Sequence, residues 1–396
     1  QDFEMIPVGK AIVCLIWLFW IIVIDNTAVG KDNNSMSIMD HSKMTLSEIE
    51  KVKSMVMVRD RVIKKPEYNP TYGTTYDRVV ERGYVICGTN DEFPGFSEEV
   101  YDNEDGTIVW KGFDVDICRA VAVAVFGDTD AIQFDIIDGV TRFTDLIDGS
   151  IDILSAATTY TFTRNVQKKF EFLPTTYYDG QGFITKRTLG VSSAKQMHGA
   201  KICFKGSGTA AKNIADFMEL HEIKYIPINV PENEKSQNVY LRGECDMYGT
   251  DRSGLASNRL GFNNPELHII LPEIISKEPL GPVVRYGDQK WSDIVRWTVY
   301  VLFIAEEMGI NSKNIDTFID NIDPNVQRFM GEKNGADHPN LGAKLGLTAT
   351  WSYDIIKQVG NYEEIFNRNI IQKLGLKRGL NQLYSQGGLL YAPPLK

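Results

Sequence analysis

Two parts of the sequence offer opposite charges at positions where they could hold a small ligand. Arg164, with Thr158 and Thr159 shortly before it, follows an apolar stretch over 151–154 that suits a strand. Asp251 follows another strand-like stretch much later in the chain. An arginine can bind a carboxylate through two parallel hydrogen bonds, and a carboxylate can bind an ammonium group. The pair therefore predicts a site for a zwitterion such as a free α-amino acid.

Other polar residues also follow the ends of predicted strands. Asn90, Asp91 and Phe93 come after the first strand, and Ser207 and Thr209 lie in a glycine-containing turn before a helix. Backbone N–H groups at a helix start favour a carboxylate. Because ligands of open α/β sheets bind beyond the carboxyl ends of the strands, we expect these residues to share one site.

Each of these residues also has a purely structural interpretation. Arg164 by itself would suit a solvated surface, and threonines at strand ends are common turn formers. Asp251 could cap a helix that starts near residue 253. In the same way, Thr209 could cap the helix that starts at residue 210. Phe93 and Tyr160 could stack on a ligand, but such aromatic side chains more often belong to a core.

The elements that must position these residues alternate between strands and helices from about residue 76. Helix 117–125 has apolar residues at i, i+3 and i+4, which predicts an amphipathic helix. In helix 142–147 we expect Phe143, Leu146 and Ile147 to face inward. Alternating strands and helices imply mostly parallel sheets that are covered on both faces. Further strands are expected over 84–87, 132–137, 151–154, 200–204, 225–230 and 245–250, and a further helix from residue 210.

The α/β pattern restarts near residue 200, and at 396 residues the chain exceeds the usual size of one core. Extended stretches at 177–185 and 269–276 suit connections between two lobes. After residue 276 we expect helices over 291–308, 314–321 and 353–358, packed on the first lobe. The expected segments are a signal peptide (1–30), a variable lead-in or linker (31–75), the first part of lobe 1 (76–182), lobe 2 (183–271), and a return to lobe 1 with a helical extension (272–396).

Composition narrows the class of function. The 42 basic and 52 acidic residues give a net charge of −10, which argues against nucleic acid and anionic membrane surfaces as partners. The five histidines fall outside the candidate segments, and no metal-ligand spacing or nucleophile motif appears. We therefore expect no metal, no cofactor and no catalysis.

An apolar run over 11–24 follows Lys10 and precedes small residues at 27–30. A membrane span needs about 20 residues, so this run better suits the core of a signal peptide. The alternative is an uncleaved anchor. We expect a protein that is exported to the periplasm.

Cysteine usage is consistent with export. Apart from Cys14, four cysteines fall in two near pairs, and no C-x-x-C spacing suggests zinc or redox chemistry. We predict Cys87–Cys118 and Cys203–Cys245 disulfides, each contributing roughly 3–4 kcal/mol in the chain-entropy model. Four cysteines allow three connectivities, and four buried free thiols are the alternative.

Six further stretches of the sequence carry recognisable motifs, at 84–90, 112–122, 142–146, 177–183, 271–281 and 360–366. These motifs resemble the extracellular solute-binding proteins of polar amino-acid ABC transporters. The resemblance covers about residues 76–396 and is greatest to the periplasmic general L-amino-acid-binding branch, which has a longer C-terminus and four cysteines. It implies a type II periplasmic-binding-protein-like fold, in which two α/β lobes are joined by two crossing hinge strands and followed by a helical C-terminal extension.

The resemblance also implies roles for single residues. Arg164 would bind the α-carboxylate with Thr159 as a hydroxyl partner, Thr209 would lie at the helix start of the second lobe, and Asp251 would bind the α-amino group. Residues 90–93 would face the ligand side chain. The alanines at 156–157 and the turn at 206–208 depart from the more polar family pattern, which affects the side-chain preference. The implied partners are a free L-amino acid and a membrane-embedded ABC permease, with the protein itself a monomer.

Two other classes of function compete with an amino-acid receptor. A dehydratase acting on a carboxylated ring compound would need a carboxylate near the leaving group, for which Asp91 and Glu92 are the candidates. A sensory or ion-channel ligand-binding domain would need fused transmembrane helices, and nothing after residue 30 is apolar enough for one. The sequence therefore favours a solute-binding protein.

Overall fold

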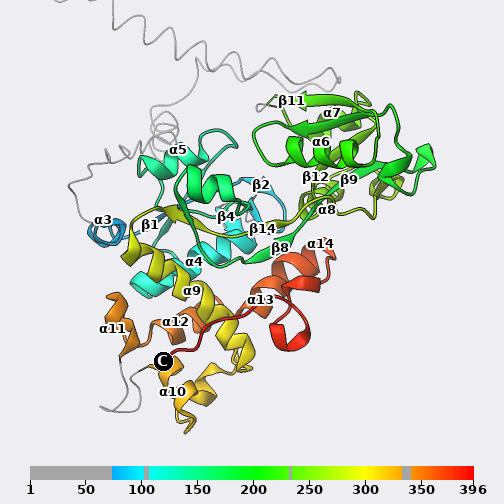
Figure 1. Ribbon diagram of the computed structural model, residues 1–396. Helices are drawn as coiled ribbons and strands as arrows, with labels where there is room; N and C mark the ends of the chain where they lie inside the picture. Colours follow the sequence, from blue (N-terminus) through cyan, green and yellow to red (C-terminus); the bar gives the residue numbers. More distant parts are fainter. Residues whose placement is uncertain (1–73, 102–106, 232–233, 332–339) are drawn as a thin grey trace, which may run out of the picture. The chain divides into compact units, whose positions relative to one another are not determined.

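The computed structural model describes residues 74–101, 107–231, 234–331 and 340–396. Two predicted segments lie outside these residues. They are the signal peptide (1–30), which contains Cys14, and the lead-in up to residue 73. Most described strands form two separate five-stranded sheets, which carry helices on their faces (Figure 1). We define lobe 1 as the sheet that contains β1 (Val85–Thr89) with the helices packed on it. Lobe 2 is the sheet that contains β10 (Lys201–Lys205) with its own helices.

The sheet of lobe 1 has the strand order β5-β1-β6-β15-β7. β1 pairs in parallel with β5 and β6, whereas β15 is antiparallel to β6 and β7. All five residues of β1 are buried, which explains why its sequence is a continuous run without polar alternation. The bounds are β1 Val85–Thr89, β5 Ile132–Ile136, β6 Ile153–Leu154, β7 Phe170–Phe172 and β15 Val283–Arg285.

The sheet of lobe 2 has the order β11-β10-β12-β9-β13 and the same mixed character. β10 pairs in parallel with β11 and β12, and β9 is antiparallel to β12 and β13. The predicted two-lobed α/β fold is confirmed. In each sheet four strands run in the same direction and one strand, β15 in lobe 1 and β9 in lobe 2, runs in the opposite direction. The bounds are β9 Gln181–Lys186, β10 Lys201–Lys205, β11 Ile226–Val230, β12 Met247–Asp251 and β13 His268–Ile270.

Two short strands connect the sheets. β8 (Tyr177–Asp179) leads into β9, and β14 (Glu278–Leu280) lies between β13 and β15 in the chain. The two strands pair with each other in antiparallel register, with Glu278 opposite Asp179. The second crossing strand thus lies just after the stretch 269–276 in which the sequence placed it.

Lobe 1 carries helices α3 (Thr75–Arg82), α4 (Phe113–Phe126) and α5 (Arg142–Ile147). The helix α4 is buried almost all round rather than amphipathic, because α9 (Gln289–Glu307), α12 (Trp351–Gln358) and α13 (Tyr362–Phe366) pack against it in addition to the strands of the sheet. Ile147 was expected to face inward, but it ends α5 and is 55% exposed. A small antiparallel sheet of β2 (Glu92–Phe93), β3 (Ser97–Tyr101) and β4 (Ile108–Lys111) precedes α4.

Lobe 2 carries α6 (Ala210–Leu220), α7 (Ser236–Leu241) and α8 (Arg252–Leu260). The helix α6 buries Ile214 and Met218 on the face that packs on β10 and β12. Because α6 and α8 begin directly after a turn or strand of this sheet, their first residues lie at the edge where the parallel strands end.

The C-terminal part is helical (Figure 1). Its helices α9 and α12 pack on α4 of lobe 1, and α14 (Gln372–Leu374) contacts α8 of lobe 2. The helix α9 begins after Asp288, whose side chain accepts a hydrogen bond from the Trp291 backbone N–H at 3.2 Å and so caps the helix. The helix expected over 314–321 is a short 3-10 turn, Ile315–Phe318. The bounds are α9 Gln289–Glu307, α10 Pro324–Met330, α11 Leu341–Leu345, α12 Trp351–Gln358, α13 Tyr362–Phe366 and α14 Gln372–Leu374.

Both predicted disulfide pairs are present. Cys87 of β1 is joined to Cys118 of α4, with the Cα atoms 6.3 Å apart. Cys203 of β10 is joined to Cys245, just before β12, with the Cα atoms 5.8 Å apart. Each disulfide bond therefore links two segments of the same lobe. None of the helices within the described ranges combines the length and the hydropathy that a transmembrane span requires.

Candidate ligand-binding site

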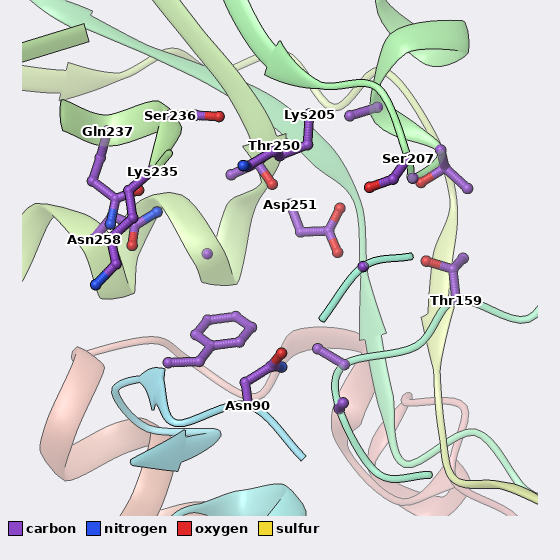
Figure 2. A pocket seen from close by; sticks show the side chains of 18 of the residues that line it. Asn90, Thr159, Lys205, Ser207, Lys235, Ser236, Gln237, Thr250, Asp251 and Asn258 are labelled. Carbon is purple, nitrogen blue, oxygen red and sulfur yellow. The ribbon is translucent and has the colours of Figure 1, made fainter. Parts of the chain in front are cut away.

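A cavity of about 390 Å³ is lined by residues from both lobes. Figure 2 shows its polar side chains arranged around the Asp251 carboxylate. The residues that the sequence predicted and that line it are Asn90, Asp91, Phe93, Thr159, Arg164, Ser207, Thr209 and Asp251. They meet because they follow the carboxyl ends of strands in the two sheets.

Thr158 is the predicted residue that does not line the cavity. Its side chain is fully buried, and its hydroxyl donates to the Ala156 carbonyl oxygen at 3.2 Å. Successive side chains of an extended segment point to opposite sides, so Thr159 faces the cavity and Thr158 faces the lobe. Tyr160 lies outside the lining too, because its ring stacks on Phe172 with the centroids 4.7 Å apart.

Arg164 lies in a short π-helical turn, Thr163–Gln167, and is only 8% exposed. One guanidinium nitrogen donates to the Thr159 carbonyl oxygen at 2.8 Å, and the guanidinium lies 5.3 Å from the centre of the Phe143 ring. Burial lowers the pKa of Arg164, whereas the carboxylates of Glu278 and Asp251 raise it. Among the described residues Arg164 forms no ion pair, so the guanidinium is held in place and keeps donors for a ligand carboxylate.

The turn after β6 is hydrogen-bonded to the side chain of Asp114, a residue of α4. The Asp114 carboxylate accepts hydrogen bonds from the Ala157 backbone N–H at 2.8 Å and from the Ser155 hydroxyl at 3.2 Å. Ala157, which lines the cavity, has φ +43°, a left-handed conformation that an alanine rarely adopts. Burial raises the pKa of Asp114 to about 6, although both hydrogen bonds oppose this shift. A buried carboxylate thus holds a strained residue in the cavity wall.

The lobe 2 wall begins with the turn 206–209. Thr209 stands at the N-cap of α6, but its side chain caps no backbone N–H group. Its hydroxyl instead donates to Glu278 of the crossing strand β14 at 3.2 Å. Ser207 and Gly208 are exposed at the start of the helix, where backbone N–H groups suit a carboxylate.

Asp251 ends β12 and stands at the N-cap of α8, again without a side-chain capping bond. The capping interpretation of this residue is therefore wrong. Burial and the neighbouring carboxylates of Asp179 and Glu278 raise the pKa of Asp251 well above its usual range, while Arg164 and Arg142 lower it. A positive ligand group would relieve this crowding of negative charge.

Glu278 is a site residue that the sequence reasoning missed. It is 1% exposed and accepts hydrogen bonds from the Asn213 amide at 2.6 Å and the Ser276 hydroxyl at 2.7 Å, besides that from Thr209. Asn213 also donates to Gln181 at 2.9 Å. The crossing strand β14 is thus hydrogen-bonded, through Glu278, to the first turns of α6. The sequence signal for Glu278 lies in the stretch 271–281, which is one of the motifs of the family resemblance.

Glu278 does not line the cavity itself, and the lining residues that the sequence reasoning missed lie mostly in lobe 2. Lys205 ends β10, and its ammonium group donates to the carbonyl oxygens of Pro231 and Glu234, so it holds the loop that leads to α7. The remaining missed side chains come from this loop, from α7 and α8, from β12 and from the start of α5. They are Glu234, Lys235, Ser236, Gln237, Tyr248, Thr250, Asn258 and Arg142.

No group of three or more His, Cys, Asp or Glu side chains in the described part of the chain could hold a metal ion. The cavity instead presents a cation from lobe 1 and an anion from lobe 2. A molecule with a carboxylate next to an ammonium group is complementary to both. It would contact both lobes at once.

Comparison with known families is consistent with this geometry. The model of the bacterial extracellular solute-binding proteins, family 3, matches residues 85–308. The chain belongs to this family. Its members include relatives that match most of the chain, so the family resemblance expected from the motifs is confirmed.

Two relatives and one solved structure show how far the similarity extends. The general L-amino acid-binding periplasmic protein of Rhizobium johnstonii is 46% identical over 82% of this chain and 93% of its own length. The glutamate/glutamine/aspartate/asparagine-binding protein of Rhodobacter capsulatus is 43% identical over 82% of this chain and 94% of its own. A periplasmic binding protein from Brucella ovis, solved with glutathione bound, is 41% identical with a TM-score of 0.77, covering 82% of this chain and 100% of that one.

Proposed function

We propose that this protein captures free L-amino acids outside the cytoplasm and delivers them to an ABC permease. The observation that carries the proposal is that Arg164 from lobe 1 and Asp251 from lobe 2 line one cavity. Relatives over 40% identical are named for binding amino acids, which supports the same ligand class here.

In this proposal each predicted residue has a defined contact. Arg164 binds the α-carboxylate together with Thr159 and the backbone N–H groups of the turn 206–209. Asp251 binds the α-ammonium group, and Thr209 and Ser207 add hydrogen bonds from lobe 2. Asn90, Asp91 and Phe93 face the ligand side chain. Thr158 acts indirectly, since its hydroxyl shapes the turn that presents Thr159.

Closure of the lobes would do the work of capture. A ligand that contacts Arg164 and Asp251 stabilises the arrangement in which both are near it, at the expense of arrangements in which the lobes are apart. No bond is made or broken, so the proposal requires no catalytic residue. The dehydratase alternative gains no support from the family or from the relatives.

Glutathione is a second candidate ligand. The Brucella ovis relative was solved with glutathione bound, and the γ-glutamyl group of glutathione carries the same α-carboxylate and α-ammonium groups as a free amino acid. The cavity of about 390 Å³ lies within the range of roughly 300–1,000 Å³ that accommodates ligands larger than one amino acid.

The remaining parts of the proposal concern the setting. We infer that the protein is exported to the periplasm by the apolar N-terminal segment, acts as a monomer and meets the permease after closure. Periplasmic relatives that cover most of the chain support the location.

Calorimetric titration of the purified protein with each of the twenty amino acids and with glutathione tests the proposal. We expect saturable binding of several amino acids with one site per chain. Binding of none of these ligands would overturn the proposed function, and turnover of a bound ligand would favour an enzyme.

A further inference from the structure

The cavity has a second polar end that the proposed contacts to the zwitterion leave unused. Figure 2 shows Gln237 and Asn258 on the side of the cavity away from Thr159 and Ser207, with Asp251 between the two groups. Both residues come from helices of lobe 2, α7 and α8. A ligand held at Asp251 can therefore extend a side chain toward them.

The chemistry of this end is that of amides and a hydroxyl. The Asn258 amide donates one hydrogen bond to the Tyr248 hydroxyl at 3.2 Å, which leaves the Asn258 carbonyl oxygen and a second N–H. Tyr248 is 6% exposed, and burial raises its pKa to about 12, so it stays protonated. Gln237 is half-buried, and its side chain makes no hydrogen bond with a described residue. Donors and acceptors thus occur together.

A glycine keeps the route to this end open. Gly254 lies one helical turn before Asn258 on α8, so both face the cavity. A Cβ atom at position 254 would lie 3.3 Å from the Thr250 methyl carbon and 3.8 Å from the tip of the Phe93 ring. The Thr250 hydroxyl oxygen would lie 3.9 Å from the same Cβ atom, so the wall beside Gly254 combines two apolar groups with one hydroxyl, and a side chain at this position would narrow the cavity.

We propose that Gln237, Asn258 and Tyr248 form a subsite that binds an amide at the end of the ligand's side chain, as in glutamine or a γ-glutamyl peptide. An amide donates and accepts, and this wall offers both functions in return. This inference rests on the proposed function, because the α-amino-acid head must be held at Arg164 and Asp251 for the side chain to reach the subsite.

Charged side chains of both signs adjoin the subsite. The Lys205 ammonium group is bound to two carbonyl oxygens of the adjoining loop. Lys235 lines the cavity beside Gln237 and Asn258 (Figure 2), and the Glu234 side chain lines it too and is paired with Arg242. Because the charges at this end are mixed, they do not select an anion, and a neutral amide can pair with both the donors and the acceptors of Gln237 and Asn258.

The test is a titration of Gln237→Leu with glutamine, glutathione, alanine and methionine. Methionine matches glutamine in length without an amide, and alanine has the shared head group alone. We expect the Kd for glutamine to rise about tenfold, since a buried ligand amide loses its partner. The Kd values for alanine and methionine should change less than about twofold. Glutathione should weaken with glutamine if the γ-amide of both ligands uses the subsite, and stay unchanged if free glutamine alone does.

Asn238→Leu is the matched control, because Asn238 is the next residue of α7 and its side chain is exposed. It should bind all four ligands as the unaltered protein does. Asn258→Ala provides a second variant should Gln237→Leu unfold, and its Kd for glutamine should rise in the same way. Equal weakening of glutamine, methionine and alanine, or no weakening of glutamine, would overturn the subsite and leave the proposed function standing. If the unaltered protein binds none of the ligands, the proposed function itself fails.

Discussion

Arg164 and Asp251 line the same cavity although they belong to different lobes. Arg164 follows β6 of lobe 1, and Asp251 ends β12 of lobe 2. The two side chains interact electrostatically: the Asp251 carboxylate raises the pKa of Arg164, and the Arg164 guanidinium lowers the pKa of Asp251. A zwitterion placed between them would satisfy both charges. The site is therefore also the element that would favour closure.

Asp251 should lose a proton when an amino acid binds. Burial and the carboxylates of Asp179 and Glu278 raise its pKa well above the usual range in the empty cavity. A ligand ammonium group favours the ionised carboxylate, so binding at or below that raised pKa releases the proton. Calorimetry at one pH in buffers of different ionisation enthalpy measures the release, which should decrease as the pH rises. Asp251→Asn should bind more weakly and release none, and a buffer-independent enthalpy in the unaltered protein would contradict the assignment.

Glu278→Gln should reduce that proton release. The substitution removes a negative charge that raises the pKa of Asp251, so more of the Asp251 carboxyl is already ionised before the ligand arrives. The glutamine side chain has nearly the same shape and keeps one acceptor oxygen for Thr209 or Asn213. Calorimetry under the same conditions provides the comparison. An unchanged release would show that Glu278 does not act on Asp251.

Asp114 should make stability depend on pH in an unusual direction. Its pKa is raised from 3.8 to about 6, so the folded protein holds a proton that the unfolded chain has lost between these values. The contribution of this group to stability is full below about pH 4 and is lost as the pH rises through 6. In Asp114→Asn the amide stays neutral, and its oxygen and N–H can still pair with Ala157 and Ser155.

The check is the difference in unfolding free energy between Asp114→Asn and the unaltered protein, measured by chemical denaturation from pH 4 to pH 8. The variant should gain relative stability across that range, by at most about 3 kcal/mol. A difference that does not vary with pH would contradict the raised pKa.

The C-terminal extension should stabilise the crossing strand β8. The Asn381 amide accepts a hydrogen bond from the Tyr178 backbone N–H at 2.6 Å and donates one to its carbonyl oxygen at 3.2 Å. Asn381 is 3% exposed, so Asn381→Ala leaves both backbone groups without their partner and should cost about 1–3 kcal/mol. Thermal unfolding measures the loss. Asn263→Ala, at an exposed position, should have no such effect, and equal stability of the two variants would argue against this role.

The sequence predicted the site well where it lies at the ends of parallel strands. Asn90, Thr159 and Asp251 could be placed together because the strand before each of them is apolar and ends abruptly. Thr158 could not be separated from Thr159, since the direction of a side chain after a strand depends on the backbone of the turn. The sequence pattern of a strand thus predicts where the strand ends more reliably than the direction in which each following side chain points.

The rest of the site depends on packing between distant segments. Gln237 and Asn258 come from two helices that approach each other only in the folded lobe, and no local pattern marks either as a lining residue. Glu278 lies in a three-residue crossing strand, too short for a periodic signal. The exposure of Ile147 and the burial of α4 on all sides follow from which helices cover lobe 1, which the order of elements along the chain does not specify.

The central claim is that Arg164 binds the group that all ligands share. Calorimetric titration of Arg164→Ala with every ligand of the unaltered protein tests it most directly. The control is Arg187→Ala, at an exposed position of lobe 2 that does not line the cavity. Truncating one partner of a buried charged pair costs about 2–5 kcal/mol, so each Kd should rise at least about thirtyfold. Arg187→Ala should leave every Kd unchanged. If Arg164→Ala lost some ligands and kept others at full affinity, Arg164 would bind a side chain, and the account of the site would be wrong.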